Sequence, residues 1–273
     1  MGKIMKIDSL NQTLYEKTSI VKEYTFTQKS ELWLEEKTIF EKYEKYIRDK
    51  AVLDVGCGGG RMAIALSEMT SNYTGIDYSK EMIKACQKWH SSLNFLYGDA
   101  SDMQMFDAES FDFILFAFNG IDSMSQEKRI KALKEIYRVL KIGGIFAFSS
   151  HNLDNQKIVV AFNKYDMKSP RSIANNILNI ISYLKVRKYQ VRTDTYQILS
   201  DPLCGFGYLT YYIRKPDQVK QLEDIGFQDI AILNRKAQFI DVNFLDRDSE
   251  WLYYICKKPT SPDRTQGSET EPK

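Results

Sequence analysis

Apolar residues in this chain follow two patterns, one of short continuous runs and one of helical spacing. Residues 51–55 and 111–118 are nearly continuous apolar runs with the length of a buried strand. Over residues 130–140, in contrast, apolar residues recur at intervals of three and four, which predicts a helix. Strands that read as apolar runs are covered on both faces, as in a parallel sheet flanked by helices. The pattern therefore predicts an α/β fold.

Two segments fall outside this alternation and suggest additions to the sheet. Residues 30–47 carry a helical pattern before the first strand, and residues 151–214 are too long for a simple connection before the helix expected at 216–225. Within the longer segment we expect a helix near 173–184, a strand over 189–199 and an aromatic cluster. The predicted organisation is an N-terminal helical extension at 1–47, a main domain at 48–258 with a cap inserted at about 153–214, and a disordered tail at 259–273.

The first apolar run leads into a glycine loop with the pattern Asp54-x-Gly56-x-Gly58-x-Gly60. Glycines let the backbone bend sharply and approach a ligand, and the helix that follows points its N-terminus at that ligand. The dinucleotide fingerprint GxGxxG would need glycine at position 61, where this chain has Arg61. The loop therefore predicts a nucleotide site that does not favour nicotinamide cofactors.

This spacing resembles the first motif of the class I S-adenosylmethionine (SAM) dependent methyltransferases. The resemblance implies an acid after the second strand for the ribose hydroxyls, which Asp77 supplies, and an acid after the third strand for the adenine amino group, which Asp99 supplies. A fourth landmark is the sequence at 141–144, a lysine, an isoleucine where the family usually has proline, and two glycines.

The resemblance implies a seven-stranded doubly wound Rossmann-like sheet whose last strand is antiparallel, with SAM as the cofactor. The residues expected to bind the cofactor are Asp54, Gly56, Cys57, Gly58, Gly60, Arg61, Asp77, Tyr78, Asp99, Ala100, Ala117 and Phe118. Taken singly, Asp54 could bond only its own loop, and the other two acids could be helix caps or turn residues. Their order at the ends of successive strands, where open α/β sheets bind ligands, favours the cofactor site.

Three polar residues are candidates for catalysis. His151 follows the fifth strand, at the rim where ligands bind, and could act as a general base; a loop histidine bonded to backbone is an equal alternative. Asn119 and Asp122 follow the fourth strand, near the expected position of the transferred methyl group, and either could orient the nucleophile. Asp122 could instead cap the helix that begins near Ser125, an interpretation that we slightly favour.

Two aromatic residues before the first strand, Tyr24 and Trp33, could line the pocket as part of a lid, although ordinary core packing is the more common role. The aromatic cluster of the cap, Phe206, Tyr208, Tyr211 and Tyr212, could contact substrate or could simply pack.

Composition adds limits on partners and compartment. The 38 basic and 36 acidic residues give a net charge of +2, too small to attract nucleic acid or an anionic membrane globally. The basic stretch at 185–192 is the best local argument for an anionic partner, but a solvated face of the cap explains it more simply. Four scattered cysteines without a CxxC pair argue against a zinc site and against disulfides. No apolar run approaches the length of a membrane span, so we expect a cytoplasmic protein without a membrane partner.

The sequence therefore predicts a SAM-dependent methyltransferase that modifies oxygen or nitrogen of a small polar metabolite, glycan or natural product, without a metal. A SAM-binding regulatory module or pseudoenzyme with a protein partner is one alternative. An RNA methyltransferase is another, although no Asn-Pro pair follows the fourth strand, which lowers methylation of nucleic-acid amines.

Overall fold

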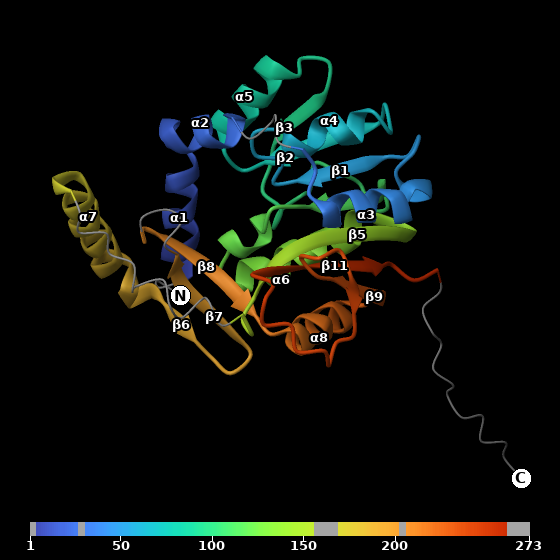
Figure 1. Cartoon of the computed structure of the whole chain (residues 1–273). Helices are drawn as coiled ribbons and strands as arrows, with labels where there is room; N and C mark the ends of the chain where they lie inside the picture. The colour runs from blue at the N-terminus through green and yellow to red at the C-terminus, as the bar shows by residue number, and fades with distance from the viewer. Residues whose placement is uncertain (1–3, 27–30, 156–168, 202–205, 261–273) are drawn as a thin grey trace, which may run out of the picture.

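The computed structural model describes residues 4–26, 31–155, 169–201 and 206–260. Its centre is a mixed sheet in which seven strands follow the order β3-β2-β1-β4-β5-β11-β9 (Figure 1). These strands are β1 (Val52–Val55), β2 (Tyr73–Asp77), β3 (Asn94–Tyr97), β4 (Phe111–Phe116), β5 (Leu140–Asn152), β9 (Gln228–Leu233) and β11 (Trp251–Lys257).

The strand directions agree with the predicted doubly wound fold. Strands β1 to β5 pair in parallel, whereas β11 lies antiparallel to both β5 and β9. The prediction of a Rossmann-like sheet with an antiparallel last strand is confirmed. Four short or inserted strands extend it to an eleven-stranded sheet in the described part of the chain: β10 (Phe239–Ile240) beside β9, and β6 (Val191–Arg192), β7 (Tyr196–Asp201) and β8 (Tyr208–Ile213) from the segment after β5.

Helices cover both faces of the central sheet and bury two apolar clusters. On one face α3 (Leu34–Lys42), α4 (Arg61–Ser67) and α5 (Lys80–Trp89) pack against the strands, and on the other α6 (Gln126–Val139) and α8 (Lys215–Ile225) do so. Successive side chains of β1 explain why both faces are needed: Val52 is buried in one cluster and Leu53 in the other. This sandwich holds the carboxyl ends of β1, β2 and β4 at one edge.

The segment between β5 and α8 forms an addition attached to that edge. It contains the helix α7 (Pro170–Val186), the short 3-10 helix η6 (Arg187–Tyr189) and strands β6 to β8. Strand β8 pairs in parallel with β5, where Tyr212 lies beside His151. The single strand expected over 189–199 was wrong, because Thr193 accepts a bond from the Tyr196 amide through its hydroxyl and turns the chain between β6 and β7.

Two helices that the sequence pattern did not distinguish precede α3. They are α1 (Ile4–Tyr15) and α2 (Thr18–Phe26), and Figure 1 shows them between the central sheet and α7. Asn11 of α1 donates to the carbonyl oxygens of Ser123 and Leu209, at 2.8 and 2.7 Å. Through these two bonds α1 joins the main domain, at Ser123, to strand β8, at Leu209.

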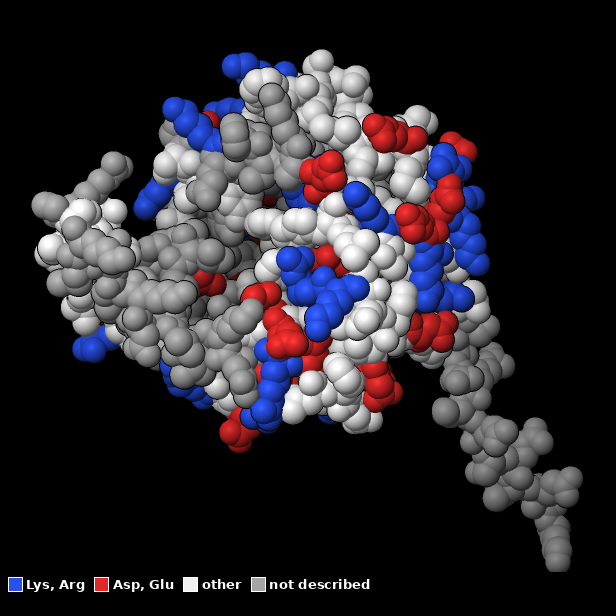
Figure 2. Space-filling model, in the orientation of Figure 1, with Lys and Arg blue, Asp and Glu red and all other residues white. Residues whose placement is uncertain are grey.

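None of the helices in these described ranges combines the length and the apolar character that a membrane crossing requires. Cys57, Cys86 and Cys256 are free and buried, while Cys204 and the tail beyond residue 260 lie outside the described residues. Acidic and basic side chains are interspersed on the face shown in Figure 2, as the near-zero net charge leads one to expect.

Candidate active site

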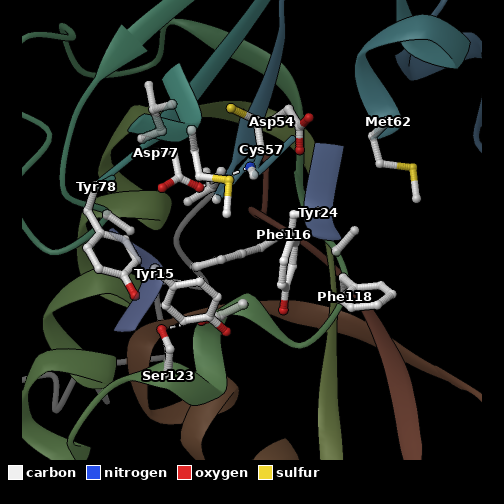
Figure 3. Close-up of a pocket in the computed structure, with 18 of the residues that line it drawn as sticks. Tyr15, Tyr24, Asp54, Cys57, Met62, Asp77, Tyr78, Phe116, Phe118 and Ser123 are labelled. Atoms are coloured by element: carbon white, nitrogen blue, oxygen red, sulfur yellow. Dashed lines mark hydrogen bonds between the residues drawn. The ribbon is translucent and has the colours of Figure 1, made fainter. Parts of the chain in front are cut away.

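A pocket opens at the carboxyl ends of β1, β2 and β4, beneath α1 and α2. Its atom-free space is about 880 Å³, a figure that includes the solvent at its open side. Figure 3 shows the carboxylates of Asp54 and Asp77 on one side and the rings of Tyr15, Tyr24 and Phe118 on the other. The pocket thus combines two acids with an aromatic wall.

The glycine loop forms the floor of this pocket in a conformation that side chains resist. Gly56, Gly58 and Gly60 have φ values of 64°, 52° and 86°, and Gly60 is the N-cap residue of α4. A Cβ atom on Gly56 would also lie 2.6 Å from the ring of Phe116. Only glycine fits there, so the loop keeps its backbone open toward a ligand.

Asp77 ends β2 with a carboxylate that is buried in the pocket wall. Its two oxygens accept bonds from the backbone amides of Gly58, at 2.9 Å, and Ser79, at 2.8 Å. Burial raises the pKa of this carboxyl to about 6, although the two backbone bonds act in the opposite direction. Ser79, and not Asp77, caps α5, because the Ser79 hydroxyl accepts from the amide of Met82.

Asp54 lies in the same wall and is held from the neighbouring strand. The hydroxyl of Tyr73 donates to it at 2.9 Å, and burial raises the pKa of Asp54 to about 7. The Tyr73 side chain reaches Asp54 across Gly75, the register partner of Asp54, where a Cβ atom would lie 2.7 Å from the tyrosine oxygen. Within the described residues the bond to the Asp54 carboxylate comes from Tyr73, whereas one interpretation of the sequence had Asp54 bonding only its own loop.

Ten of the twelve predicted cofactor residues line the pocket, and Gly60 and Asp99 do not. Asp99 accepts from the amide and hydroxyl of Ser101 and pairs with Lys128 at 2.7 Å. Burial opposes its ionisation, but the bonds from Lys128 and Ser101 outweigh that effect and hold the pKa of Asp99 below its ordinary value. Gly98 and Ala100, on either side of it, do line the pocket, so the adenine contact of Asp99 stays a prediction.

The N-terminal helices bring aromatic rings over the pocket. Tyr24 of α2 lines it, as the sequence suggested, and so does Tyr15 of α1, which the sequence did not single out. Tyr15 packs edge to face against Tyr24, Tyr78 and Tyr208, and its hydroxyl donates to that of Tyr208 at 3.1 Å. Because Tyr208 belongs to β8, the pocket cover is built jointly by the N-terminal helices and the inserted strands.

Trp33 lies beside the pocket, outside the residues that line it. Its ring stacks on Phe118 at 5.1 Å and packs against Trp251 at the same distance. Arg61 lines the pocket, but its guanidinium is bonded to the buried Glu36 through both terminal nitrogens. Both residues therefore tie α3 to the edge of the pocket.

The three predicted catalytic residues lie together and are not among the residues that line the pocket. The Nδ1 atom of His151 lies 2.7 Å from Oδ2 of Asp122, and its Nε2 atom lies 3.4 Å from Nδ2 of Asn119. Asn119 is flanked by Phe118 and Gly120, which both line the pocket. Phe118 and Asn119 each have a φ of 56°, and successive left-handed residues of this kind cost free energy and gather at functional sites.

Asp122 does not cap the helix that follows it, so the slightly favoured interpretation was wrong. Ser125 is the N-cap of α6, and Asp122 is instead a buried acceptor for Ser150, for the His151 backbone amide and for Arg129. Arg129 is completely buried and also donates to Gln218 of α8 and to Ser150. The short 3-10 helix η3 (Gly120–Ser123) points Asp122 inward, and sequence spacing gives no sign of that direction.

The fold is that of an α/β protein with a Rossmann-like sheet and a pocket at the carboxyl ends of its strands. Residues 52–144 match a family model described as a methyltransferase domain. These residues therefore form a methyltransferase domain, and the family that the glycine loop predicted is confirmed over this part of the chain. SAM is the cofactor that this assignment brings with it.

Relatives with assigned names match part of the chain. A phthiotriol/phenolphthiotriol dimycocerosates methyltransferase of Mycobacterium tuberculosis is 36% identical over 111 residues, 39% of this chain and 40% of the relative. A fatty-acid O-methyltransferase of Mycolicibacterium smegmatis is 34% identical over 108 residues, 38% of each chain. The matched region thus spans less than half the length of these relatives.

Solved structures extend the likeness to most of the fold. A SAM-dependent methyltransferase of Methanosarcina mazei superposes with a TM-score of 0.54 at 19% identity, covering 81% of this chain and 98% of that one. The 1,6-didemethyltoxoflavin-N1-methyltransferase of Burkholderia thailandensis, solved with S-adenosylhomocysteine, gives 0.54 at 14% identity, covering 90% and 88%. At these identities the likeness shows the fold.

The residues of the pocket fit SAM in three respects. The glycine loop leaves room for close approach to the backbone, and the buried carboxylate of Asp77 offers two oxygens to a pair of hydroxyls. Tyr15, Tyr24 and Phe118 present aromatic rings, which attract positively charged groups such as a sulfonium.

Proposed function

We propose that this chain is a SAM-dependent methyltransferase that transfers the methyl group to an oxygen of a small molecule, with His151 as general base. The observation that carries the proposal is the contact of 2.7 Å between His151 Nδ1 and the buried carboxylate of Asp122. An ionised carboxylate can only accept, so Nδ1 carries the proton and Nε2 has the lone pair. That lone pair faces Nδ2 of Asn119 at 3.4 Å, and a hydroxyl of the acceptor would take the place of this amide as the donor. A cytoplasmic location stays a prediction.

The residues of the chain itself need only supply a base, hold the acceptor and exclude water. When bound, SAM supplies a methyl group that is already activated on sulfur. His151 would remove the proton of the acceptor hydroxyl around the moment of attack, and Asp122 would stabilise the charged imidazole that results. Asn119 would hold the acceptor beside the pocket, while Tyr15 and Tyr24 would exclude water.

The pocket also bears on the kind of acceptor. Its aromatic wall favours an acceptor with an apolar part next to the reacting hydroxyl, and a natural product of that kind falls within the small-molecule classes expected from the sequence. One relative is named a fatty-acid O-methyltransferase, which supports oxygen over nitrogen for this chain.

Matched acceptors test the choice of atom. We would measure formation of S-adenosylhomocysteine from SAM with alcohols and with amines of the same carbon skeleton, such as octanol and octylamine or benzyl alcohol and benzylamine. His151→Ala should slow transfer to the alcohols by roughly 10² to 10⁴-fold while the affinity for SAM stays unchanged. His90→Ala is the control, because His90 is the only other histidine and lies at the C-terminal end of α5.

The outcomes separate the possible functions. Turnover of amines in preference to alcohols, or full activity of His151→Ala, would reject the general base and the choice of oxygen. SAM binding without turnover of any small-molecule acceptor would favour the regulatory module, and turnover restricted to RNA would favour the RNA methyltransferase.

A further inference from the structure

Helix α7 carries an apolar face that the structure leaves in contact with solvent. Five aliphatic residues recur along one side of it and are each between 37% and 53% exposed: Ile173, Ile177, Ile180, Ile181 and Leu184. The helix is attached through its other side, where Val186 is buried with Ile7 of α1 and Ile198 of β7. Figure 1 shows α7 at the outer edge of the molecule, away from the central sheet. An exposed apolar stripe of this length indicates an interaction surface.

Positive charge gathers at one end of this stripe. Residues 169–193 contain five lysines and arginines and neither Asp nor Glu. Four of the five follow the stripe and are exposed: Lys185, Arg187, Lys188 and Arg192. Cations are common in the last turn of a helix, but this cluster continues beyond α7 through η6 into β6. The helix dipole alone therefore does not explain the cluster.

The same cations surround a shallow hollow. Arg187, Lys188 and Arg192 line it together with Tyr183 and Gln190. Arginine, lysine and amide groups are the donors that hold phosphate oxygens. Lys185 stands four residues after Ile181, so the charged end and the apolar stripe adjoin on one side of the helix.

We propose that α7, with η6 and β6, docks this protein on the surface of an anionic lipid bilayer. The stripe enters the boundary between headgroups and acyl chains, and the cations lie at the level of the lipid phosphates. A nucleic acid would use the cations but would leave the isoleucine side chains in water. A second copy of the chain would bury the stripes but gains nothing from the cations beside them.

This surface differs from the sequence-based expectation of no membrane partner, which rested on the net charge of the whole chain and on the lack of an apolar run long enough to span a membrane. Membrane attraction falls off within a Debye length, so four cations gathered on one edge act locally whatever the net charge is. The inference does not depend on methyl transfer, and His151→Ala should bind vesicles as the unaltered protein does.

Co-sedimentation with lipid vesicles tests the proposal. We expect binding to vesicles of equal parts phosphatidylglycerol and phosphatidylcholine, weak binding to phosphatidylcholine alone, and release in 0.5 M salt, chosen here as about three times physiological ionic strength. Lys185→Gln with Lys188→Gln should weaken binding by roughly 30-fold, about 5-fold for each charge. Ile177→Gln with Ile181→Gln should weaken it by roughly 10-fold or more.

Matched controls lie elsewhere on the surface. Lys84→Gln with Lys220→Gln removes two lysines whose side chains are 68% and 71% exposed, and Ile142→Gln removes an isoleucine that is 54% exposed, close to the 53% of Ile177. Equal binding by control and test variants, or no preference for the anionic lipid, would overturn the proposal. So would a dimer in light scattering that the Ile177 and Ile181 changes dissolve without any vesicle binding, or retention of duplex RNA in place of vesicles.

Discussion

Replacing Asp77 by asparagine should weaken SAM binding in a way that depends on pH. Burial raises the pKa of Asp77 to about 6, so the carboxyl is about 99% ionised at pH 8 and only about 9% ionised at pH 5. If the ionised form accepts the ribose hydroxyls, the unaltered protein must lose a proton before it binds. Its dissociation constant should then rise about tenfold from pH 8 to pH 5 through this group alone.

The side-chain amide of the Asp77→Asn variant cannot carry the charge, so the effect of the substitution should change with pH. At pH 8 the loss of hydrogen bonds to a charged acceptor, about 1.5 to 3 kcal/mol, corresponds to roughly 10- to 150-fold weaker binding. At pH 5 the native carboxyl is mostly protonated and resembles the amide in its hydrogen-bonding groups. The ratio of the two dissociation constants should therefore be about tenfold smaller at pH 5 than at pH 8.

Calorimetric titration with SAM at pH 5, 6, 7 and 8 measures this ratio. Asp54 titrates in both proteins, and because Asp77 contributes less to its raised pKa than burial does, most of its contribution cancels in the comparison. Asp224→Asn is the control, because the Asp224 side chain is 61% exposed on α8 and far from the pocket lining. A ratio that is the same at pH 5 and pH 8 would refute the role of the ionised carboxylate, and equal affinities at every pH would reject Asp77 as a cofactor residue.

Three further changes test the supports of the site. Gly56→Ala should abolish SAM binding and lower the free energy of unfolding by more than about 1 kcal/mol, because the added Cβ atom meets an aromatic ring at 2.6 Å and φ is 64°. Unchanged SAM affinity in calorimetry and unchanged stability in urea unfolding would show that the loop tolerates alanine. Tyr73→Phe should destabilise the protein by about 1 to 3 kcal/mol at pH 8 and by less at pH 5, where Asp54 is protonated, and an equal loss at both pH values in urea unfolding would contradict this. Arg129→Met should cost about 3 to 5 kcal/mol by leaving Asp122 buried without its cation, and adding Asp122→Asn should recover part of that loss; full additivity in urea unfolding would argue against the pairing.

The sequence predicted the parts of the fold that local patterns determine. The glycine loop and the apolar run before it identified β1 and the start of α4. A strand buried on both faces requires an apolar run, and the turn that follows requires glycines, so both features can be seen in the sequence. The fifth strand was expected as well, but β5 runs to Asn152 and therefore contains His151, which was expected to follow that strand. Tyr24 was one possible lid residue, with core packing as the more common role, and it does line the pocket.

Sequence patterns could not predict the contacts between distant segments of the chain. Tyr15 is held at the pocket by such contacts, among them the bonds of Asn11 to Ser123 and to Leu209, nearly two hundred residues away. The network around Arg129 joins α6, η3, β5 and α8, and an arginine on a helix gives no sign that it will be buried. Asp122 looked like a cap because aspartate often precedes helices, and only the turn of η3 directs it toward His151.

The ionised forms of the two buried acids of the pocket should favour SAM binding but lower the stability of the ligand-free protein. Burial raises the pKa of Asp54 to about 7 and that of Asp77 to about 6, above the ordinary aspartate value of about 3.9. The folded protein therefore holds these protons more tightly than the unfolded chain, and the stability they contribute below about pH 4 is lost as the pH rises through 6 and 7. A ligand that donates hydroxyls to one carboxylate and carries positive charge near both favours the ionised forms. Stabilisation by SAM should therefore be larger at pH 8 than at pH 5, since the charges that destabilise the ligand-free fold are those that the ligand needs.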